Sequence, residues 1–165
     1  MLYENTKDRV RQKEVEKIVA QFLSSFPITG TGLDNKSYFT MKETNRSLAL
    51  GHDVDIFHHG RYVAVAEIKC RTGKYNLDYM KKKGWLVEKS LMVYLWREHH
   101  KLGRHAMIVN QTSDGYVYYT MLTTLMGIAD SLDEVSGMCK SDHGKRDRDA
   151  ISFVVPFDVM KEMVV

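Results

Sequence analysis

Four charged residues fall within a short stretch that otherwise has the pattern of an apolar β-hairpin. Asp53 and Asp55 precede a turn, and Glu67 and Lys69 follow it near the end of the run YVAVAEIKC. Residues two apart on a strand share a face, so a hairpin can bring the two polar pairs together. Burying such ions costs roughly several kcal/mol each unless they neutralise one another or hold a cation.

Clustered carboxylates are hard oxygen ligands of the kind that Mg²⁺ takes, with Mn²⁺ as a substitute, and Mg²⁺ commonly bridges protein carboxylates to substrate phosphates. A lysine beside the ion helps to orient or deprotonate an attacking water. The alternative is an ordinary cross-strand ion pair at a solvated sheet edge, worth about a few tenths of a kcal/mol. An isolated Glu-x-Lys favours the alternative, whereas its position at the end of an apolar strand, facing two aspartates, favours the metal site.

Hydrophobic periodicity predicts the elements that would hold these residues. The pattern predicts a helix over 8–26, a loop over 28–37, a strand over 38–44, and a hairpin of 53–57 and 62–70 turning at Gly60. It then predicts one long helix over 77–100, or two broken at Gly84, a second hairpin of 104–111 and 115–122, an irregular stretch over 123–149, and a final strand and short helix over 150–160. This order indicates one mixed sheet with helices packed on it.

Length and composition are consistent with a single domain over residues 1–165. The chain is 44% hydrophobic with a net charge of +3, a charge too small to indicate a nucleic-acid partner by itself. No apolar run is long enough for a membrane span, and the N-terminus is charged, so we expect neither a membrane location nor export. Two widely spaced cysteines favour a reducing cytoplasm.

The hairpin resembles a known family. Asp55-Ile-Phe before the turn and Glu67-Ile-Lys69-Cys-Arg71 after it are similar to the PD-(D/E)XK nuclease superfamily, the restriction-endonuclease-like group that includes archaeal Holliday junction resolvases. The later part of the chain is similar to small phage-encoded proteins of this group. The resemblance implies an α/β fold whose central mixed sheet is flanked by helices, with a core in the order helix, three strands, helix, strand.

The resemblance also implies roles for particular residues. Asp55 and Glu67 would be metal ligands, and Lys69 would be the catalytic lysine. The proline that names the motif is absent, and Asp53 is the alternative ligand. We prefer Asp55 because two apolar residues follow it, as in the resolvase pattern.

Members of this superfamily often add a glutamate from the first helix. Glu16 lies beside the apolar stripe of the predicted helix and is our choice, and Glu14 on the other flank of the stripe is the alternative. Either side chain is equally consistent with a solvated helix face.

Basic residues follow directly on the proposed site. Contacts with DNA phosphates are expected from Arg71, Lys74, Lys81, Lys82 and Lys83. A second basic cluster, Lys140, Lys145, Arg146 and Arg148, is largely cancelled by neighbouring aspartates.

The pattern as a whole predicts a Mg²⁺-dependent endonuclease that hydrolyses DNA phosphodiester bonds, acting in the cytoplasm of a bacterial or phage-infected cell. The alternative is a module on the same fold that binds nucleic acid or protein without cleavage, because a fold does not establish an activity. Whether two chains assemble as a homodimer is left open.

Overall fold

The computed structural model describes residues 2–25, 39–43, 52–139 and 148–165. The α-helices are α1 (Leu2–Ser24), α2 (Leu77–Lys83), α3 (Lys89–Glu98) and α4 (Leu122–Ile128), and short 3₁₀ helices follow at η1 (His100–Leu102), η2 (Ala129–Ser131) and η3 (Phe157–Val159). The strands are β1 (Phe39–Glu43), β2 (Val54–His58), β3 (Arg61–Cys70), β4 (Trp85–Glu88), β5 (His105–Gln111), β6 (Val117–Met121), β7 (Asp133–Cys139), β8 (Arg148–Val155) and β9 (Lys161–Glu162). The loop expected over 28–37 lies outside the described residues.

The strands form two sheets. The larger has the order β1-β2-β3-β5-β6-β9, in which β3 and β5 are parallel and the other neighbours are antiparallel. The smaller has the order β4-β8-β7 and is antiparallel throughout. The predicted mixed sheet with flanking helices is therefore confirmed. The prediction of a single sheet is wrong, because β4, β7 and β8 pair with one another and not with the larger sheet.

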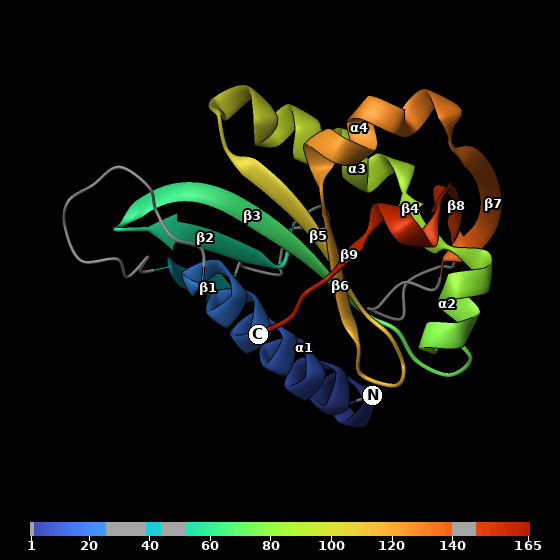
Figure 1. Cartoon of the computed structure of the whole chain (residues 1–165), viewed down its shortest axis with the longest axis horizontal. Helices are drawn as coiled ribbons and strands as arrows, with labels where there is room; N and C mark the ends of the chain where they lie inside the picture. Colours follow the sequence, from blue (N-terminus) through green and yellow to red (C-terminus); the bar gives the residue numbers. More distant parts are fainter. Residues whose placement is uncertain (1, 26–38, 44–51, 140–147) are drawn as a thin grey trace.

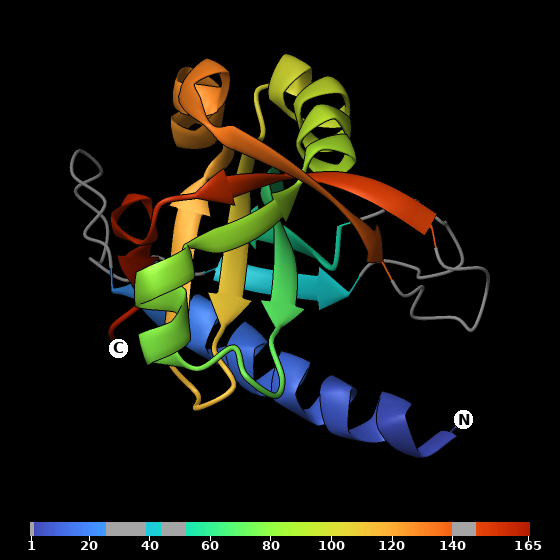
Figure 2. The ribbon, with the colours of Figure 1, turned by 90° about the vertical axis from the view of Figure 1, so that its right-hand side faces the viewer.

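The two faces of the larger sheet pack against different elements. α1 covers one face, where Val15 and Val19 are fully buried against Ala66 and Ile68. The smaller sheet, α3 and α4 lie over the other face, where Val65 joins a second apolar cluster (Figures 1 and 2). Alternation along β3 makes each of its residues face either α1 or the smaller sheet. We call the second side the inner face.

The hairpin of β2 and β3 carries a β-bulge. Its two-residue turn, His59 and Gly60, has φ angles of 48° and 77°, as a type I′ turn requires. Phe57 pairs with Tyr62, but Ile56 pairs with Ala64, so Val63 is an extra residue in β3. The bulge shifts the register by one residue for the rest of the hairpin.

A single arginine anchors α1 beside the carboxyl ends of β3 and β5. The guanidinium of Arg11 donates to the carbonyl oxygens of Arg71 at 2.9 Å and Thr112 at 3.1 Å. It also donates to Oε1 of Gln111 at 3.0 Å. These three bonds fix the helix close to the end of the strand that carries Lys69.

The long helix predicted over 77–100 is interrupted. α2 ends at Gly84, which has φ 77°, and a Cβ atom there would lie 2.5 Å from the carbonyl oxygen of Val155. Only glycine admits β8 this closely, so the chain leaves the helix and forms β4 before α3 begins. The prediction of two helices broken at Gly84 is right, and the strand between them was missed.

The rest of the chain is more regular than expected. The stretch predicted to be irregular contains α4, η2 and β7. The predicted final strand is present as β8, but a single 3₁₀ turn and β9 replace the expected short helix. Among the described residues, no helix is both long and apolar enough to cross a bilayer.

Candidate metal site and its buried polar neighbour

The inner face of the hairpin places Asp53 opposite Glu67. Val54 pairs with Ala66, so extending the register by one residue aligns the two acids. The Asp53 amide donates to the Ala66 carbonyl at 3.0 Å, and Oδ2 of Asp53 accepts a hydrogen bond from the Ile68 amide at 2.7 Å. The Asp53 carboxylate is thus held by backbone contacts directly beside Glu67.

Lys69 lies on the same face as Glu67, two residues further along β3. Its Nζ atom is 2.7 Å from Oε1 of Glu67. The lysine side chain is 43% exposed, whereas that of Glu67 is 7% exposed. The lysine therefore joins a buried carboxylate to solvent, where a phosphate group could approach.

The second oxygen of Glu67 lacks a donor. Oε2 is buried and accepts no hydrogen bond. Burial raises the pKa of Glu67 to about 7, the charge of Lys69 opposes this rise, and the nearby charge of Asp53 adds to it. Two adjacent carboxylates repel each other unless a proton or a cation lies between them.

These features fit a magnesium ion. Mg²⁺ keeps several water ligands and commonly takes only one or two carboxylates from a protein, together with substrate phosphates. Asp53 and Glu67 would supply two. No group of three or more His, Cys, Asp or Glu side chains suited to a metal ion occurs across residues 2–25, 39–43, 52–139 and 148–165. The described residues therefore fit a two-carboxylate site and not an all-protein cage.

Asp55, the preferred ligand, is engaged elsewhere. It lies opposite Val65, and its Oδ1 atom accepts a hydrogen bond from the hydroxyl of Tyr62. The same oxygen contacts Nε2 of His52. The structure thus places Asp53, the alternative ligand, beside Glu67, where the sequence favours Asp55.

Residues that sequence reasoning missed surround Asp55. His52 is 8% exposed, and its Nδ1 atom lies 3.4 Å from the hydroxyl of Tyr94 on α3. His99 packs its ring against His52 at 4.6 Å between centroids, and the guanidinium of Arg104 lies 4.0 Å from the ring centre of Tyr62. Two tyrosines and two histidines distributed over a hairpin and a distant helix have no spacing that would reveal this contact. We call His52, Asp55, Tyr62, Tyr94, His99 and Arg104 the histidine cluster.

The electrostatics of the histidine cluster differ from those of the carboxylate pair. The pKa of His99 is lowered to about 4, chiefly by burial and also by the neighbouring His52 and Arg104. Burial and the charges of Glu98, Asp55 and Glu67 raise the pKa of Tyr94. The hydroxyl of Tyr94 therefore interacts electrostatically with both the histidine cluster and Glu67.

The first-helix glutamates lie on the other side of the sheet. α1 packs on the face opposite the inner face, and Glu16 accepts a hydrogen bond from Gln12 at 3.1 Å. Glu14 is exposed. A catalytic contribution of Glu16 stays a prediction.

The residues predicted to contact DNA occupy different environments. The guanidinium of Arg71 donates to the Leu86 carbonyl at 2.8 Å and to Oδ1 of Asn110 at 3.3 Å, so it links β3 to β4 and β5. Lys74 is exposed, with its ammonium 5.4 Å from the ring centre of Tyr79. The predicted contacts on α2, Lys81, Lys82 and Lys83, are all exposed. Of the second basic cluster, Lys140, Lys145 and Arg146 lie outside the described residues.

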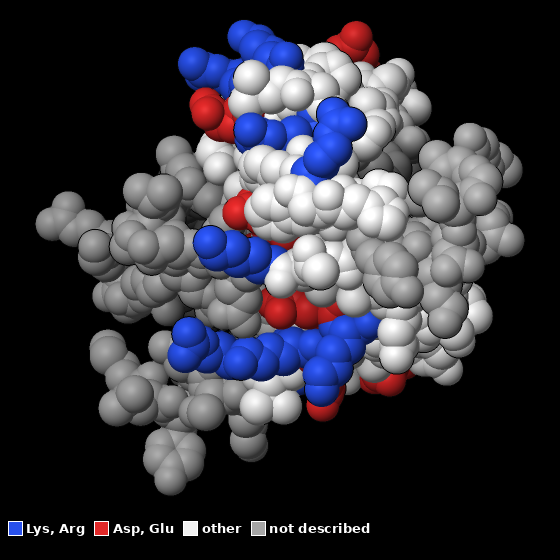
Figure 3. Space-filling model, turned by 90° about the vertical axis from the view of Figure 1, so that its left-hand side faces the viewer, with Lys and Arg blue, Asp and Glu red and all other residues white. Residues whose placement is uncertain are grey.

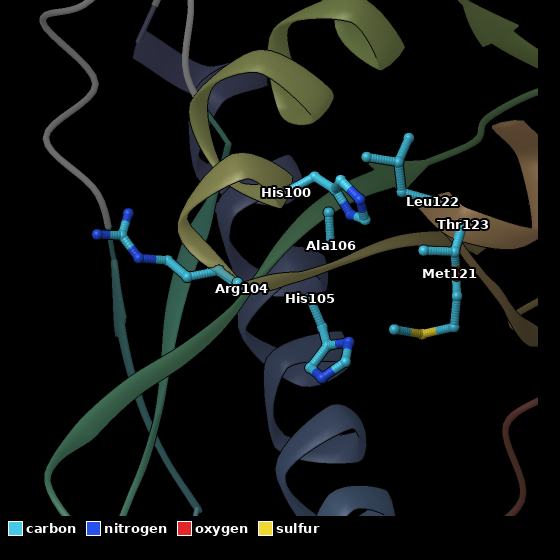
Figure 4. Close-up of a pocket in the computed structure, with 8 residues that line it drawn as sticks. His100, Arg104, His105, Ala106, Met121, Leu122 and Thr123 are labelled. Atoms are coloured by element: carbon cyan, nitrogen blue, oxygen red, sulfur yellow. The ribbon is translucent and has the colours of Figure 1, made fainter.

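The surface carries charge of both signs. On the side seen from the left of Figure 1, acidic side chains lie recessed between lysine and arginine side chains (Figure 3). A separate pocket at the start of β5 and α4 is lined by His100, Ala106 and Leu122 among others. Figure 4 shows Arg104 pointing away from the other side chains of that pocket. With its nearest arginine directed elsewhere, this pocket is a poor candidate for an anion site.

Comparison with known proteins gives no relative: no protein-family model, no curated protein and no solved structure matches the chain.

Proposed function

We propose that this chain is a Mg²⁺-dependent nuclease that hydrolyses DNA phosphodiester bonds. The observation that carries the proposal is the buried carboxylate of Glu67, which has one oxygen without a donor, a second acid opposite it and a lysine ammonium 2.7 Å away. The chain order of α1, three antiparallel strands, intervening helices and the parallel strand β5 agrees with the core that the PD-(D/E)XK resemblance implies.

Each residue has a distinct task in this proposal. Asp53 and Glu67 hold the ion, which when bound polarises a phosphodiester and lowers the pKa of a bound water. The exposed ammonium of Lys69 orients the attacking water and stabilises the charge that develops on the phosphate oxygens. Lys74, Lys81 and Lys82 contact backbone phosphates without reading sequence.

The test is a cleavage assay on linear and branched DNA with Mg²⁺, with Mn²⁺ and with chelator. We expect cleavage that requires the metal, and a Lys69→Ala variant that binds DNA but does not cleave it. Lys161→Ala is the matched control, because Lys161 is an exposed lysine at the opposite end of the sheet, on β9. Cleavage by Lys69→Ala at the wild-type rate would remove the lysine from its role.

One observation supports the alternative of a binding module without catalysis. The ion pair between Lys69 and Glu67 already neutralises part of the buried charge. A chain that binds DNA, takes up no Mn²⁺ in calorimetry and cuts none of the substrates would establish this alternative. In either case, the double variant Lys81→Ala/Lys82→Ala should lower the slope of log affinity against log salt by about 1 to 2 if both lysines contact phosphates.

A further inference from the structure

Asp55 has the partners of a structural acid. Its Oδ1 atom accepts a hydrogen bond from the Tyr62 hydroxyl and contacts Nε2 of His52. Tyr62 is partly buried and His52 is buried. In contrast to Oε2 of Glu67, Oδ1 of Asp55 has donors within hydrogen-bond distance.

The partners of His52 define where its proton lies. A carboxylate accepts only, so Nε2 must carry the proton that points to Asp55. In the neutral tautomer that carries this proton, Nδ1 is an acceptor, and the Tyr94 hydroxyl 3.4 Å away is in place to donate to it. The direction of donation thus runs from Tyr94 on α3 through His52 to Asp55, where the donation from Tyr62 also ends.

Two members of this network, His52 and Asp55, flank Asp53 in the sequence. His52 precedes Asp53 by one residue and Asp55 follows it by two, and both side chains are held by groups from β3 and α3. Between them, the Asp53 amide donates to the Ala66 carbonyl, and its carboxylate accepts from the Ile68 amide. Fixing the flanking residues restricts the backbone from which the Asp53 carboxylate projects.

The bulge in β3 makes the network possible. Regular alternation from Glu67 and Val65 would turn Tyr62 toward α1. With Val63 as the extra residue, both Val63 and Ala64 pack with the cluster under α1, and Tyr62 packs on the inner face with Val65. A bulge that re-aims one side chain onto a site residue is a recurrent structural device.

We propose that Asp55 is a positioning residue and not a ligand: through Tyr62 and His52 it holds the Asp53 carboxylate opposite Glu67 before any cation arrives. The part of this inference that concerns metal affinity rests on the proposed function. The part that concerns the hairpin stands without it. Ligands held ready in this way bind a metal more tightly because less order is lost on binding.

Amide hydrogen exchange tests the positioning without any metal. The Ile68 amide donates to the Asp53 side chain and therefore reports on its orientation. We expect Tyr62→Phe to speed Ile68 exchange about fivefold, the effect of losing one hydrogen bond, while the Val109 amide on β5 is unchanged. Tyr79→Phe is the matched control, because Tyr79 is also a partly buried tyrosine but lies on α2. It should leave the exchange of both amides as in the wild type.

Conservative and disruptive changes at Asp55 provide the second test. Asp55→Asn keeps an oxygen that accepts from Tyr62 and His52, and should retain Ile68 protection. Asp55→Leu removes the acceptor and should lose that protection. Unchanged Ile68 exchange in both Tyr62→Phe and Asp55→Leu would overturn the inference. If Asp55→Leu fails to fold, Tyr62→Phe alone decides.

Calorimetry with Mn²⁺ separates a positioning role from a ligand role. Asp55→Asn should weaken Mn²⁺ binding by less than about tenfold and Tyr62→Phe by about tenfold, the range for groups that support a ligand, whereas Asp53→Asn should abolish saturable binding. If Asp55→Asn abolishes binding as completely as Asp53→Asn, Asp55 is a ligand and the inference fails. If the wild type takes up no Mn²⁺, the proposed function fails, and hydrogen exchange still decides the positioning role.

Discussion

Two acidic groups on the same face of one hairpin have opposite surroundings. Glu67 is buried with an oxygen that accepts no hydrogen bond, and its nearest acid adds to the repulsion. Asp55 accepts from a tyrosine and contacts a histidine. Asp53 and Asp55 are only two residues apart in sequence, so residue type does not distinguish their roles. What distinguishes the two aspartates is the donors that reach them: the side chains of a tyrosine and a histidine for Asp55, and a backbone amide for Asp53.

The difference is one of free energy as well as of geometry. Supplying donors to the partly buried carboxylate of Asp55 compensates its desolvation, so the histidine cluster holds the hairpin and α3 together. Leaving an oxygen of Glu67 without a donor costs stability unless a proton or cation is present. A buried carboxylate oxygen without a donor, next to a second acid, is typical of a ligand-binding site.

The largest expected effect is the difference in kcat between a variant of Glu67 and a variant of Tyr62, the residue that supports Asp55. Glu67→Gln removes the charge of a proposed metal ligand and should lower kcat for the proposed Mg²⁺-dependent DNA cleavage by about 10³-fold or more. Tyr62→Phe removes only a supporting hydrogen bond and should lower it about tenfold. Single-turnover cleavage of one labelled duplex measures both. Equal losses in the two variants would contradict the distinction between them.

Next in size is the pH dependence of stability in chelator. The pKa of Glu67 is raised in the folded state, so between about pH 4.5 and 7 the folded chain binds more protons than the unfolded chain. Stability therefore falls as pH rises through this window, by on the order of 3 kcal/mol. Urea unfolding at several pH values measures it.

Two controls accompany this measurement. Glu67→Gln has no carboxyl to titrate and should flatten the curve, and Mg²⁺ should recover stability above pH 7. A wild-type chain that becomes more stable from pH 4.5 to 7, relative to Glu67→Gln, would contradict the account of the site.

The histidine cluster should show the opposite slope. The pKa of His99 is lowered in the folded state, so the unfolded chain binds more protons between about pH 4 and 6.5. Stability is then lost as pH falls through that window. We expect a loss of only about 1 to 2 kcal/mol, because local opening at the end of α3 lets water reach the charged ring. Acid unfolding of His99→Leu followed by circular dichroism should show less of this loss. The same acid sensitivity in His99→Leu would assign the loss to other groups.

The smallest expected effect concerns Arg104. Arg104→Met removes the cation above the Tyr62 ring and should lower the free energy of unfolding by about 0.5 to 1 kcal/mol. Arg97→Met is the matched control, since Arg97 is exposed on α3. In a Tyr62→Leu background the Arg104→Met effect should disappear. An effect that persists there would not arise from the ring contact.

Local patterns predicted the elements well where one face of an element is buried. Alternation located β2, β3, β5 and β6, and the spacing of Val15 and Val19 located α1, because each pattern reflects a single buried side. Glu67 and Lys69 as neighbours on one face also followed from alternation, and the structure has them 2.7 Å apart.

Long-range contacts limited the rest. The strand after Gly84 exists because β8, about seventy residues later, approaches the chain at that glycine. A four-residue strand between two helices has too short a pattern to detect beforehand. The same reason explains why β7 was missed.

Which aspartate lies beside Glu67 could not be predicted from the sequence for a different reason. The motif resemblance favoured Asp55 because of the apolar residues that follow it, but which acid meets Glu67 depends on the pairing register of two strands. That register depends on Val63, whose backbone departs from regular pairing although its side chain is typical of a strand. Apolar alternation carries no sign of such a departure.

The extra residue at position 63 also has a consequence for inheritance. Three nucleotides of coding sequence encode Val63, and deleting them would remove the bulge but leave Asp53 opposite Glu67, because the pairs on either side of Val63 would then follow one another regularly. A hairpin of unchanged length that paired regularly through Val63 would instead place the imidazole of His52, and not the acid of Asp53, opposite Glu67. Alignments of related hairpins should therefore allow a gap at this position before any two aspartates are equated.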